Sequence, residues 1–418
     1  MKRQSSGLTK LDILVSIGVT VILLGLLIPA INASRGPVRK NQCQTNMRNL
    51  ALAAIQHDSS KRSFPAYIQD FGIYTGNGSD LADPTHRGIP RHKKLGTWAV
   101  AILPWLDGQT TYEQWTQDRY PIIVAKNPPH LGSTTGSAVD GFHRLASPSL
   151  SIFRCPDNPA KDWQNAPNSM IYNNGMAWPT NHTSFANAQN VNNGVGNSKY
   201  NVTRVDRTTG EGTHTAEGPN TTLGDFKDGQ SCTILFSENI QALPWHRAGL
   251  IHGADLIMKH QNQQDIVFDS KMPKALAARY IHGMVWHYED AEHANAILAN
   301  QWNKLGTATP VRPSGVAPVH RINGCMNGNK DSLFNLRIRN AKNAVHLARP
   351  SSAHTNGVNT AFADGATRFV DENIDYRVFQ ALMTPSGTAS SVPFPKFVFP
   401  LTDRMQRRGW INTSEKRL

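Results

Sequence analysis

The sequence predicts an α+β protein in which a long N-terminal helix precedes a large, β-rich, antiparallel head with long loops. Three observations predict this fold. Residues 13–31 form an uncharged apolar run, and residues 43–55 carry an apolar stripe at helical spacing. The rest of the chain has short apolar runs separated by Gly, Pro, Asn and Asp, as in sheets with many turns.

The composition excludes several classes of protein. Lys and Arg number 43 against 30 Asp and Glu, a net charge of +13, yet charged residues are only 17% of the chain. Because this positive charge is spread along the chain, we predict no nucleic-acid partner. Apolar and aromatic residues occur throughout, which excludes wholesale disorder. There is no G-x-S-x-G elbow, no P-loop and no dinucleotide fingerprint, so we expect neither an enzyme nor a cofactor.

The first 31 residues are typical of a membrane-inserted N-terminus. A short basic leader, residues 1–7, contains Lys2 and Arg3 and is followed by the transmembrane half of the helix, residues 8–31. At 1.5 Å per residue its apolar run nearly crosses a hydrocarbon core of about 30 Å. The basic leader predicts a cytoplasmic N-terminus. We therefore expect a single pass through the cytoplasmic membrane, contact with membrane lipid, and a head exported to the periplasm or cell surface.

A short motif lies just before the apolar run. Gly7 and Leu8 precede it, and Asp12 follows Gly7 by five residues. The arrangement resembles the class III signal of type IV pilins and pseudopilins. The resemblance implies cleavage after Gly7 by a prepilin peptidase, methylation of Leu8, pairing of Asp12 with the terminal amine of another pilin-like subunit, and a helix bend at Pro29. The alternative is an uncleaved single-pass anchor.

The amphipathic half of the helix is predicted over residues 32–64. Its apolar stripe should pack on the head, and it comprises Cys43, Met47, Leu50 and Ala54. We expect an interruption at Gly36-Pro37 and an end at Ser63–Pro65, because proline disfavours a helical residue before it.

Four cysteines, Cys43, Cys155, Cys232 and Cys325, lie far apart and form no C-x-x-C pair, which argues against a zinc knuckle or a thioredoxin-type site. They allow three disulfide connectivities, and the sequence does not choose among them. Disulfides are expected if the head lies outside the cytoplasm. Because Cys43 belongs to the apolar stripe, a buried thiol is the alternative for that residue.

The head is predicted over residues 65–385, with strands at the apolar runs 98–105, 233–236 and 358–362. Two polar segments, 180–222 and 246–302, are interpreted as surface loops or insertions, and 386–418 as a peripheral basic tail. The second segment is rich in histidine, but no pair has the i,i+4 spacing of H-E-x-x-H, so no metal site is predicted.

A second resemblance lies near the C-terminus, where His354 is followed by nine residues and then Asp364-Gly365. With the N-terminal signal and the ordered pieces 42–66, 98–109, 153–160 and 226–240, this resembles a large family of prepilin-type surface proteins of planctomycete bacteria. That family is of unknown function and has a C-terminal H-x9-DG element. The resemblance implies a pseudopilin-like envelope protein, displayed on the membrane or in a pilus-like assembly. The alternative is a membrane-tethered extracellular protein that binds a solute or a glycan, with polysaccharide as its partner.

The residues of this element also predict local structure. Asp364-Gly365 fits a two-residue type I′ hairpin turn. That register places Phe362 and Phe369 on one face of the hairpin, toward the core. We expect His354 to hold its loop against the turn through a hydrogen bond to Asp364 or to a turn carbonyl. A ligand or metal role for His354 is the alternative.

Overall fold

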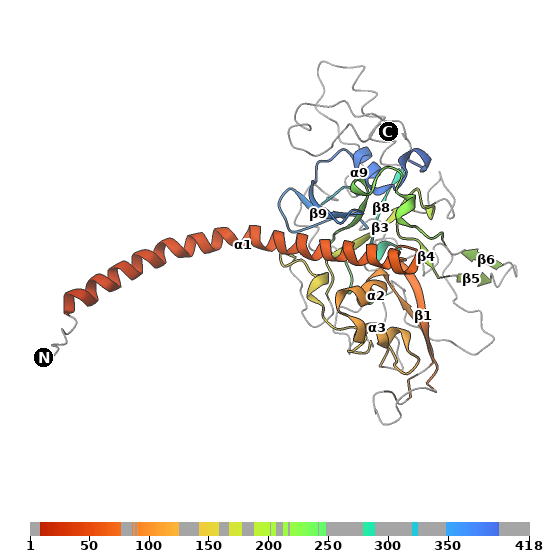
Figure 1. Ribbon diagram of the computed structural model, residues 1–418, viewed down its shortest axis with the longest axis horizontal. Coiled ribbons are helices and arrows are strands. Elements are labelled where there is room, and N and C mark those ends of the chain that lie inside the picture. The colour runs from red at the N-terminus through yellow and green to blue at the C-terminus, as the bar shows by residue number, and fades with distance from the viewer. Residues whose placement is uncertain are drawn as a thin grey trace, which may run out of the picture.

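The α+β class is confirmed. In the computed structural model a 52-residue helix, α1 (Lys10–Lys61), projects from a head of mixed sheets and short helices (Figure 1). The residues that the structure describes are 9–76, 86, 88–89, 91–124, 142–158, 167–177, 188–200, 202–205, 212–215, 218–240, 242–247, 279–288, 320–324 and 348–392. Gly7, Leu8 and Cys325 lie outside them.

Helix α1 is continuous from Lys10 to Lys61, so the interruption predicted at Gly36-Pro37 is wrong. A proline inside a helix removes one hydrogen bond and bends the axis without having to end the helix. Pro29 also lies inside α1, and Figure 1 shows the helix curving gradually over its length. The end is close to the predicted one. Arg62 takes a left-handed conformation with φ 56°, and its N–H donates to the carbonyl of Asp58.

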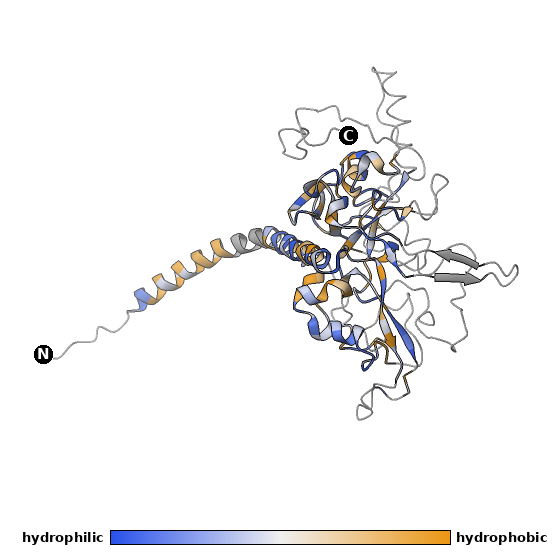
Figure 2. Cartoon of the chain, turned by 45° about the vertical axis from the view of Figure 1, so that its right-hand side comes forward, coloured by the Kyte–Doolittle hydropathy of each residue, from blue (hydrophilic) through white to orange (hydrophobic). Residues whose placement is uncertain are grey.

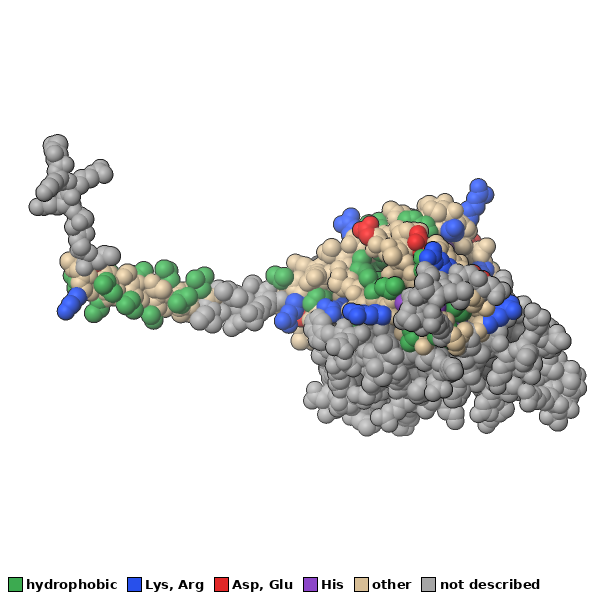
Figure 3. Space-filling model, turned by 90° about the horizontal axis from the view of Figure 1, so that it is seen from below, with side chains coloured by type: hydrophobic (Ala, Val, Ile, Leu, Met, Phe, Trp, Pro, Cys, Tyr) green, Lys and Arg blue, Asp and Glu red, His purple; other side chains and the backbone are tan. Residues whose placement is uncertain are grey.

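The two halves of α1 have opposite surroundings. In the first half, Lys10–Leu27, the large apolar side chains are 49–71% exposed, and no residue is buried. We call this the free half. Figure 2 shows that most of this part of the helix, which stands clear of the head, is hydrophobic, and Figure 3 shows its hydrophobic side chains at the surface. In the second half the predicted stripe is confirmed, because Cys43, Met47, Leu50 and Ala54 are fully buried, as is Ala51 beside them.

On one side of the buried half lies a three-stranded sheet with the order β2-β1-β4. The β1–β2 pair is antiparallel and the β1–β4 pair is parallel. The strands are β1 (Ile68–Tyr74), β2 (His92–Gly96) and β4 (Ser198–Lys199), and the helices beside them are α2 (Trp98–Ile102), η2 (Leu103–Leu106) and α3 (Gln109–Thr116).

The strand predicted at 98–105 is therefore wrong, since this run forms α2 and η2. Its length fits a short strand or a buried helix equally well. Thr97 decides the outcome locally, because its side chain accepts a hydrogen bond from the N–H of Ala99 and caps α2.

On the other side of α1 lies a five-stranded sheet with the order β10-β9-β7-β3-β8. Its β3–β8 pair is parallel and the others are antiparallel, so the sheets of the head are mixed. The strands predicted at 233–236 and 358–362 are confirmed as parts of β7 and β9. The five strands are β3 (Met170–Met176), β7 (Ile234–Glu238), β8 (Gly283–Trp286), β9 (Gly357–Phe362) and β10 (Thr367–Asp371).

Both predicted insertions contribute to this framework. Residues 188–200 provide β4 and are mostly buried, and residues 279–288 provide β8. These parts are therefore packed into the head rather than lying in surface loops. The remaining described elements are β5 (Val202–Val205), β6 (Gly212–Thr215), η3 (Ser151–Phe153), η4 (Leu223–Asp225), η5 (Gln230–Cys232), α9 (Tyr376–Met383) and η8 (Gly387–Ala389).

The five-stranded sheet is covered on both faces. Met170 and Tyr172 of β3 join one core together with the buried stripe of α1. Ile171, between them, points to the opposite face and joins a second core that includes Phe379 of α9. Because α1 packs on the first face, the helix is part of the core of the head.

The hairpin β9–β10 differs from its prediction by one residue of register. Phe369 pairs with Asn359, and the N–H of Gly365 donates to the carbonyl of Phe362. Gly365 alone among the turn residues has a positive φ, 80°. The turn is therefore a three-residue connection with a bulge at Gly365, not a type I′ turn. A slip of one residue exchanges the faces of a strand, so Phe362 and Phe369 lie on opposite faces.

Candidate functional site

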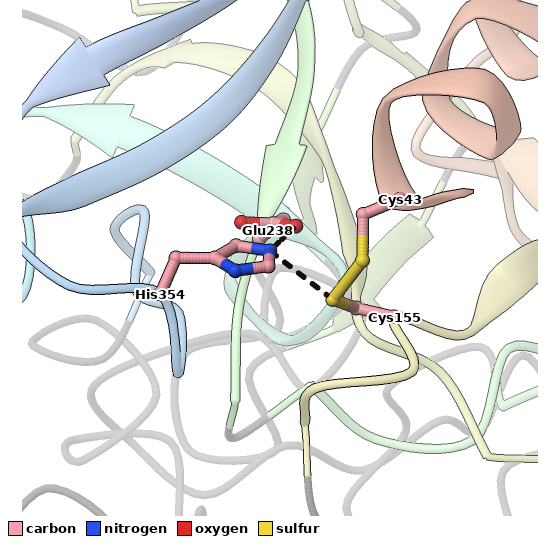
Figure 4. A group of neighbouring side chains, drawn as sticks. All are labelled: Cys43, Cys155, Glu238 and His354. Carbon is pink, nitrogen blue, oxygen red and sulfur yellow. Dashed lines mark hydrogen bonds and ion pairs between the residues drawn. A yellow bond between two sulfur atoms is a disulfide. The ribbon is translucent and has the colours of Figure 1, made fainter. Parts of the chain in front are cut away.

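His354 lies in a buried cluster where α1 meets the head (Figure 4). Four elements contribute to it. His354 comes from the loop before β9, Glu238 is the last residue of β7, Cys155 follows η3, and Cys43 lies on α1. Asp157 completes the cluster from the turn after Cys155.

The imidazole of His354 contacts three side chains. Its Nδ1 lies 3.0 Å from Oδ2 of Asp157, and its Nε2 lies 3.2 Å from Oε1 of Glu238. The same Nε2 is 3.5 Å from Sγ of Cys155. The His354 side chain is only 6% exposed, so both ring nitrogens are held by groups of the protein.

The loop that carries His354 is held by its own hydrogen bonds. The hydroxyl of Ser352 accepts from the N–H of His354 at 3.0 Å and donates to the carbonyl of Gly357 at 2.9 Å. The N–H of Ala353 donates to the side chain of Asn158 at 3.2 Å. These contacts fix the backbone of His354 relative to both β9 and the segment that carries Asp157.

Glu238 is completely buried and receives two further hydrogen bonds. Its two carboxylate oxygens accept from the backbone N–H and from the side-chain amide of Asn359, both at 3.1 Å. The amide oxygen of Asn359 in turn accepts from Nε2 of Gln44 at 3.1 Å. A continuous path of hydrogen bonds therefore runs from His354 through the sheet to α1.

Cys43 and Cys155 form a disulfide between α1 and the head, with Cα atoms 5.0 Å apart and 112 positions of sequence between them. The alternative of a buried Cys43 thiol is therefore wrong. Cys232 lies half-buried in η5. Because Cys325 lies outside the described residues, the structure leaves the other two cysteines of the predicted set untested.

The charges of the cluster favour a protonated His354. Burial by itself lowers the pKa of this imidazole, but the hydrogen bond and charge of Glu238 and the charge of Asp157 outweigh it. The pKa is raised above 6.5 in spite of the nearby positive charge of Lys40. An imidazolium donates from both nitrogens, which suits a ring placed between two carboxylates. Nη1 of Arg39 in α1 lies 3.4 Å from Oδ1 of Asp157, the carboxylate oxygen other than the one that faces His354.

The predicted contact between His354 and Asp364 is wrong. The Asp364 carboxylate instead accepts from the N–H of Ala366 at 2.8 Å, within its own turn. Sequence reasoning missed Asp157 and Glu238 as partners of the histidine. A signal was available, because both acids lie in the family-like pieces 153–160 and 226–240.

The N-terminal residues are only partly described. Asp12 caps α1, since its carboxylate accepts from the N–H of Thr9 at 3.0 Å and from the Thr9 hydroxyl at 2.7 Å. The N–H of Asp12 donates back to the same hydroxyl, which completes a capping box. Asp12 therefore has a partner within its own chain. Its pairing with a neighbouring amine stays a prediction, as do cleavage and methylation at Gly7 and Leu8.

Comparison with known proteins gives a family but no function. Residues 33–377 match the family model described as "Protein of unknown function (DUF1559)". No curated protein and no solved structure matches the chain. The match includes every member of the His354 cluster, and it begins after the free half of α1.

Proposed function

We propose that this chain, which belongs to the DUF1559 family of proteins of unknown function, is a pseudopilin-like protein of the cell envelope. The free half of α1 would anchor it in the cytoplasmic membrane, and a prepilin peptidase would cut after Gly7. The head would then be displayed on the membrane or in a pilus-like assembly, as a structural subunit rather than an enzyme. The observation that carries this proposal is the single helix α1, which is apolar and uncovered in its first part and packs an apolar stripe into the head in its second part.

The free half has the dimensions and surface of a membrane span. By length and composition, this 18-residue segment could cross a membrane. At 1.5 Å per residue it extends about 27 Å along the helix axis. Removing each large apolar side chain from water is worth about 1.5–3 kcal/mol. A helix that is apolar on all sides is stable only inside lipid or among other helices.

The hydroxyl groups of Ser16 and Thr20 in this segment are satisfied within the helix, as lipid requires. The hydroxyl of Ser16 donates to the carbonyl of Ile13 at 2.9 Å, and that of Thr20 donates to the carbonyl of Ser16 at 2.7 Å. Neither hydroxyl therefore needs water or a partner helix. This supports insertion of the free half as a single span.

The disulfide Cys43–Cys155 supports export of the head. Disulfides persist in oxidising compartments and are rare in the cytoplasm. An exported head also places Cys43 beyond the membrane, as expected when the free half spans the bilayer from a cytoplasmic leader.

The proposal is tested by the mass of the N-terminal peptide of protein isolated from its native envelope. We expect a chain that begins at N-methylated Leu8. Gly7→Val should retain the leader, whereas the control Ser5→Val changes the leader without changing the cleavage position. An intact leader on most wild-type molecules would contradict the proposal. A tethered binding protein needs no such cleavage, so the same result would favour the alternative function.

A further inference from the structure

We propose that, when its disulfide is reduced, the protein binds a zinc ion through Cys43, Cys155, Glu238 and His354. This inference goes beyond the proposed function and is independent of it. The ligand atoms of the four side chains all lie within 4.8 Å of one another (Figure 4). Two thiolates, an imidazole and a carboxylate are ligand types that zinc accepts in tetrahedral sites.

The distances already approach those of a zinc site. Zinc bonds of 2.0–2.3 Å in a tetrahedron separate neighbouring ligand atoms by about 3.3–3.8 Å. The His354 nitrogen lies 3.2 Å from the Glu238 oxygen and 3.5 Å from the Cys155 sulfur. The main change needed is separation of the two sulfurs once their bond is broken. They belong to different elements, α1 and the turn after η3, so side-chain rotation on either element moves them apart.

The surrounding groups orient the ligands as they do in known zinc sites. Nδ1 of His354 faces the Asp157 carboxylate at 3.0 Å, so its proton stays there and Nε2 points to the metal position. This is the carboxylate–histidine arrangement that commonly supports zinc. The Glu238 carboxylate is likewise held in place by two hydrogen bonds from Asn359.

Burial and charge also favour the ion. Cys43, Cys155 and Glu238 are at most 2% exposed, and a zinc ion would compensate two of the three negative charges that its thiolate and carboxylate ligands carry. His354 and Asp157 lie nearest to solvent, with side chains 6% and 18% exposed. They mark the side from which an ion would enter.

The disulfide and the zinc site are alternatives, because each uses the same two sulfurs. Reduction by a phosphine breaks the S–S bond, gives each sulfur a proton, and converts the phosphine to its oxide with oxygen from water. Zinc then displaces the two thiol protons and the Nε2 proton of His354, all three of which pass to solvent. In both states α1 remains cross-linked to the head, covalently in one and through the metal in the other.

The test uses the full chain in detergent, reduced with a phosphine and titrated with zinc against a chromogenic chelator. We expect one-to-one binding by the reduced wild type and none by the oxidised protein. His354→Ala and Glu238→Gln should each weaken binding at least tenfold, and Asp157→Asn, a positioning residue, by about 10–100-fold. The controls Cys232→Ala and Asp364→Ala should bind like wild type.

X-ray absorption spectroscopy of the zinc-loaded wild type tests the proposal without relying on any variant. We expect two sulfur ligands at about 2.3 Å and one imidazole nitrogen at about 2.0–2.1 Å. The proposal is overturned if the reduced wild type does not compete with the chelator. It is also overturned if the bound zinc has no sulfur neighbours, or if a folded His354→Ala variant keeps wild-type affinity.

Discussion

Removal of the Cys43–Cys155 disulfide should destabilise the protein strongly, because this bond closes a very long loop. The perturbation is the double substitution Cys43→Ala and Cys155→Ala. A cross-link between residues 112 positions apart restricts the unfolded chain, and the chain-entropy relation gives a loss of about 16 cal/mol/K, or about 4.8 kcal/mol at 25 °C. We therefore expect the free energy of unfolding to fall by about 4–5 kcal/mol.

The assay is urea unfolding of the full chain in detergent, followed by tryptophan fluorescence. Trp98 is a suitable reporter because it is fully buried against Phe153 and Phe236, beside the stripe of α1. The variant should unfold at lower urea and with a steeper dependence on urea, because the uncrosslinked denatured chain exposes more surface. Cys232→Ala, which leaves this bond intact, is the control. A loss below about 1 kcal/mol would refute the loop-closure reasoning, since it would mean that the denatured chain is already restricted without the bond.

Two further predictions concern His354 and Asp12. Burial lowers the pKa of His354 and its two carboxylate neighbours raise it, and the net effect is a pKa above 6.5. The contribution of His354 to the free energy of unfolding should therefore be complete below about pH 6.5 and decline as the pH rises through the folded-state pKa. His354→Gln should remove that decline from curves of stability against pH, and identical curves for the two proteins would contradict this assignment. If Asp12 pairs with a neighbouring subunit's amine, Asp12→Ala should impair assembly in native envelopes, whereas Thr9→Ala, which removes the hydroxyl of the capping box and keeps the Asp12 carboxylate, should not. Equal loss in both variants would show that capping of α1 is the role of Asp12.

The helix was the most predictable part of the fold, because its information is local and periodic. The stripe through Cys43 and Met47 follows the helical repeat, and all of its members are buried. The register of the β9–β10 hairpin could not be predicted from the local sequence alone. Asp364-Gly365 fits both a two-residue loop and a three-residue loop with a bulge. The choice rests on the φ angle of Asp364, and one residue of register then moves Phe369 to the other face of the strand.

The partners of His354 were beyond the reach of sequence spacing. Glu238 and Asp157 approach it from strands and turns far along the chain, and their positions depend on how β7 lies beside β9 and how the segment after η3 crosses α1. A buried carboxylate at the end of an apolar strand could not be predicted from the sequence. The structure explains it, because Asn359 donates two hydrogen bonds to Glu238. The H-x9-DG pattern correctly identified His354 as a residue of interest. The ten-residue spacing does not reveal that His354 contacts Asp157 and Glu238, whereas Asp364 bonds within its own turn.

The position of the cluster along α1 gives these contacts a common mechanical consequence. Among the side chains of α1 that the structure describes, Arg39 and Cys43 are two of the first to contact the head, through an ion pair with Asp157 and through the disulfide. One helical turn covers both, and Gln44 adds the path of hydrogen bonds into β9 and β7. A force on the free half would thus enter the head at this point, next to His354, before it reaches the rest of the buried stripe. Because the bond at Cys43 is covalent, the helix and the segment after η3 that carries Cys155 should move as one body even where the apolar contacts yield. When it is protonated, the imidazole of His354 strengthens the same junction electrostatically, since it holds the segments of Asp157 and Glu238 together.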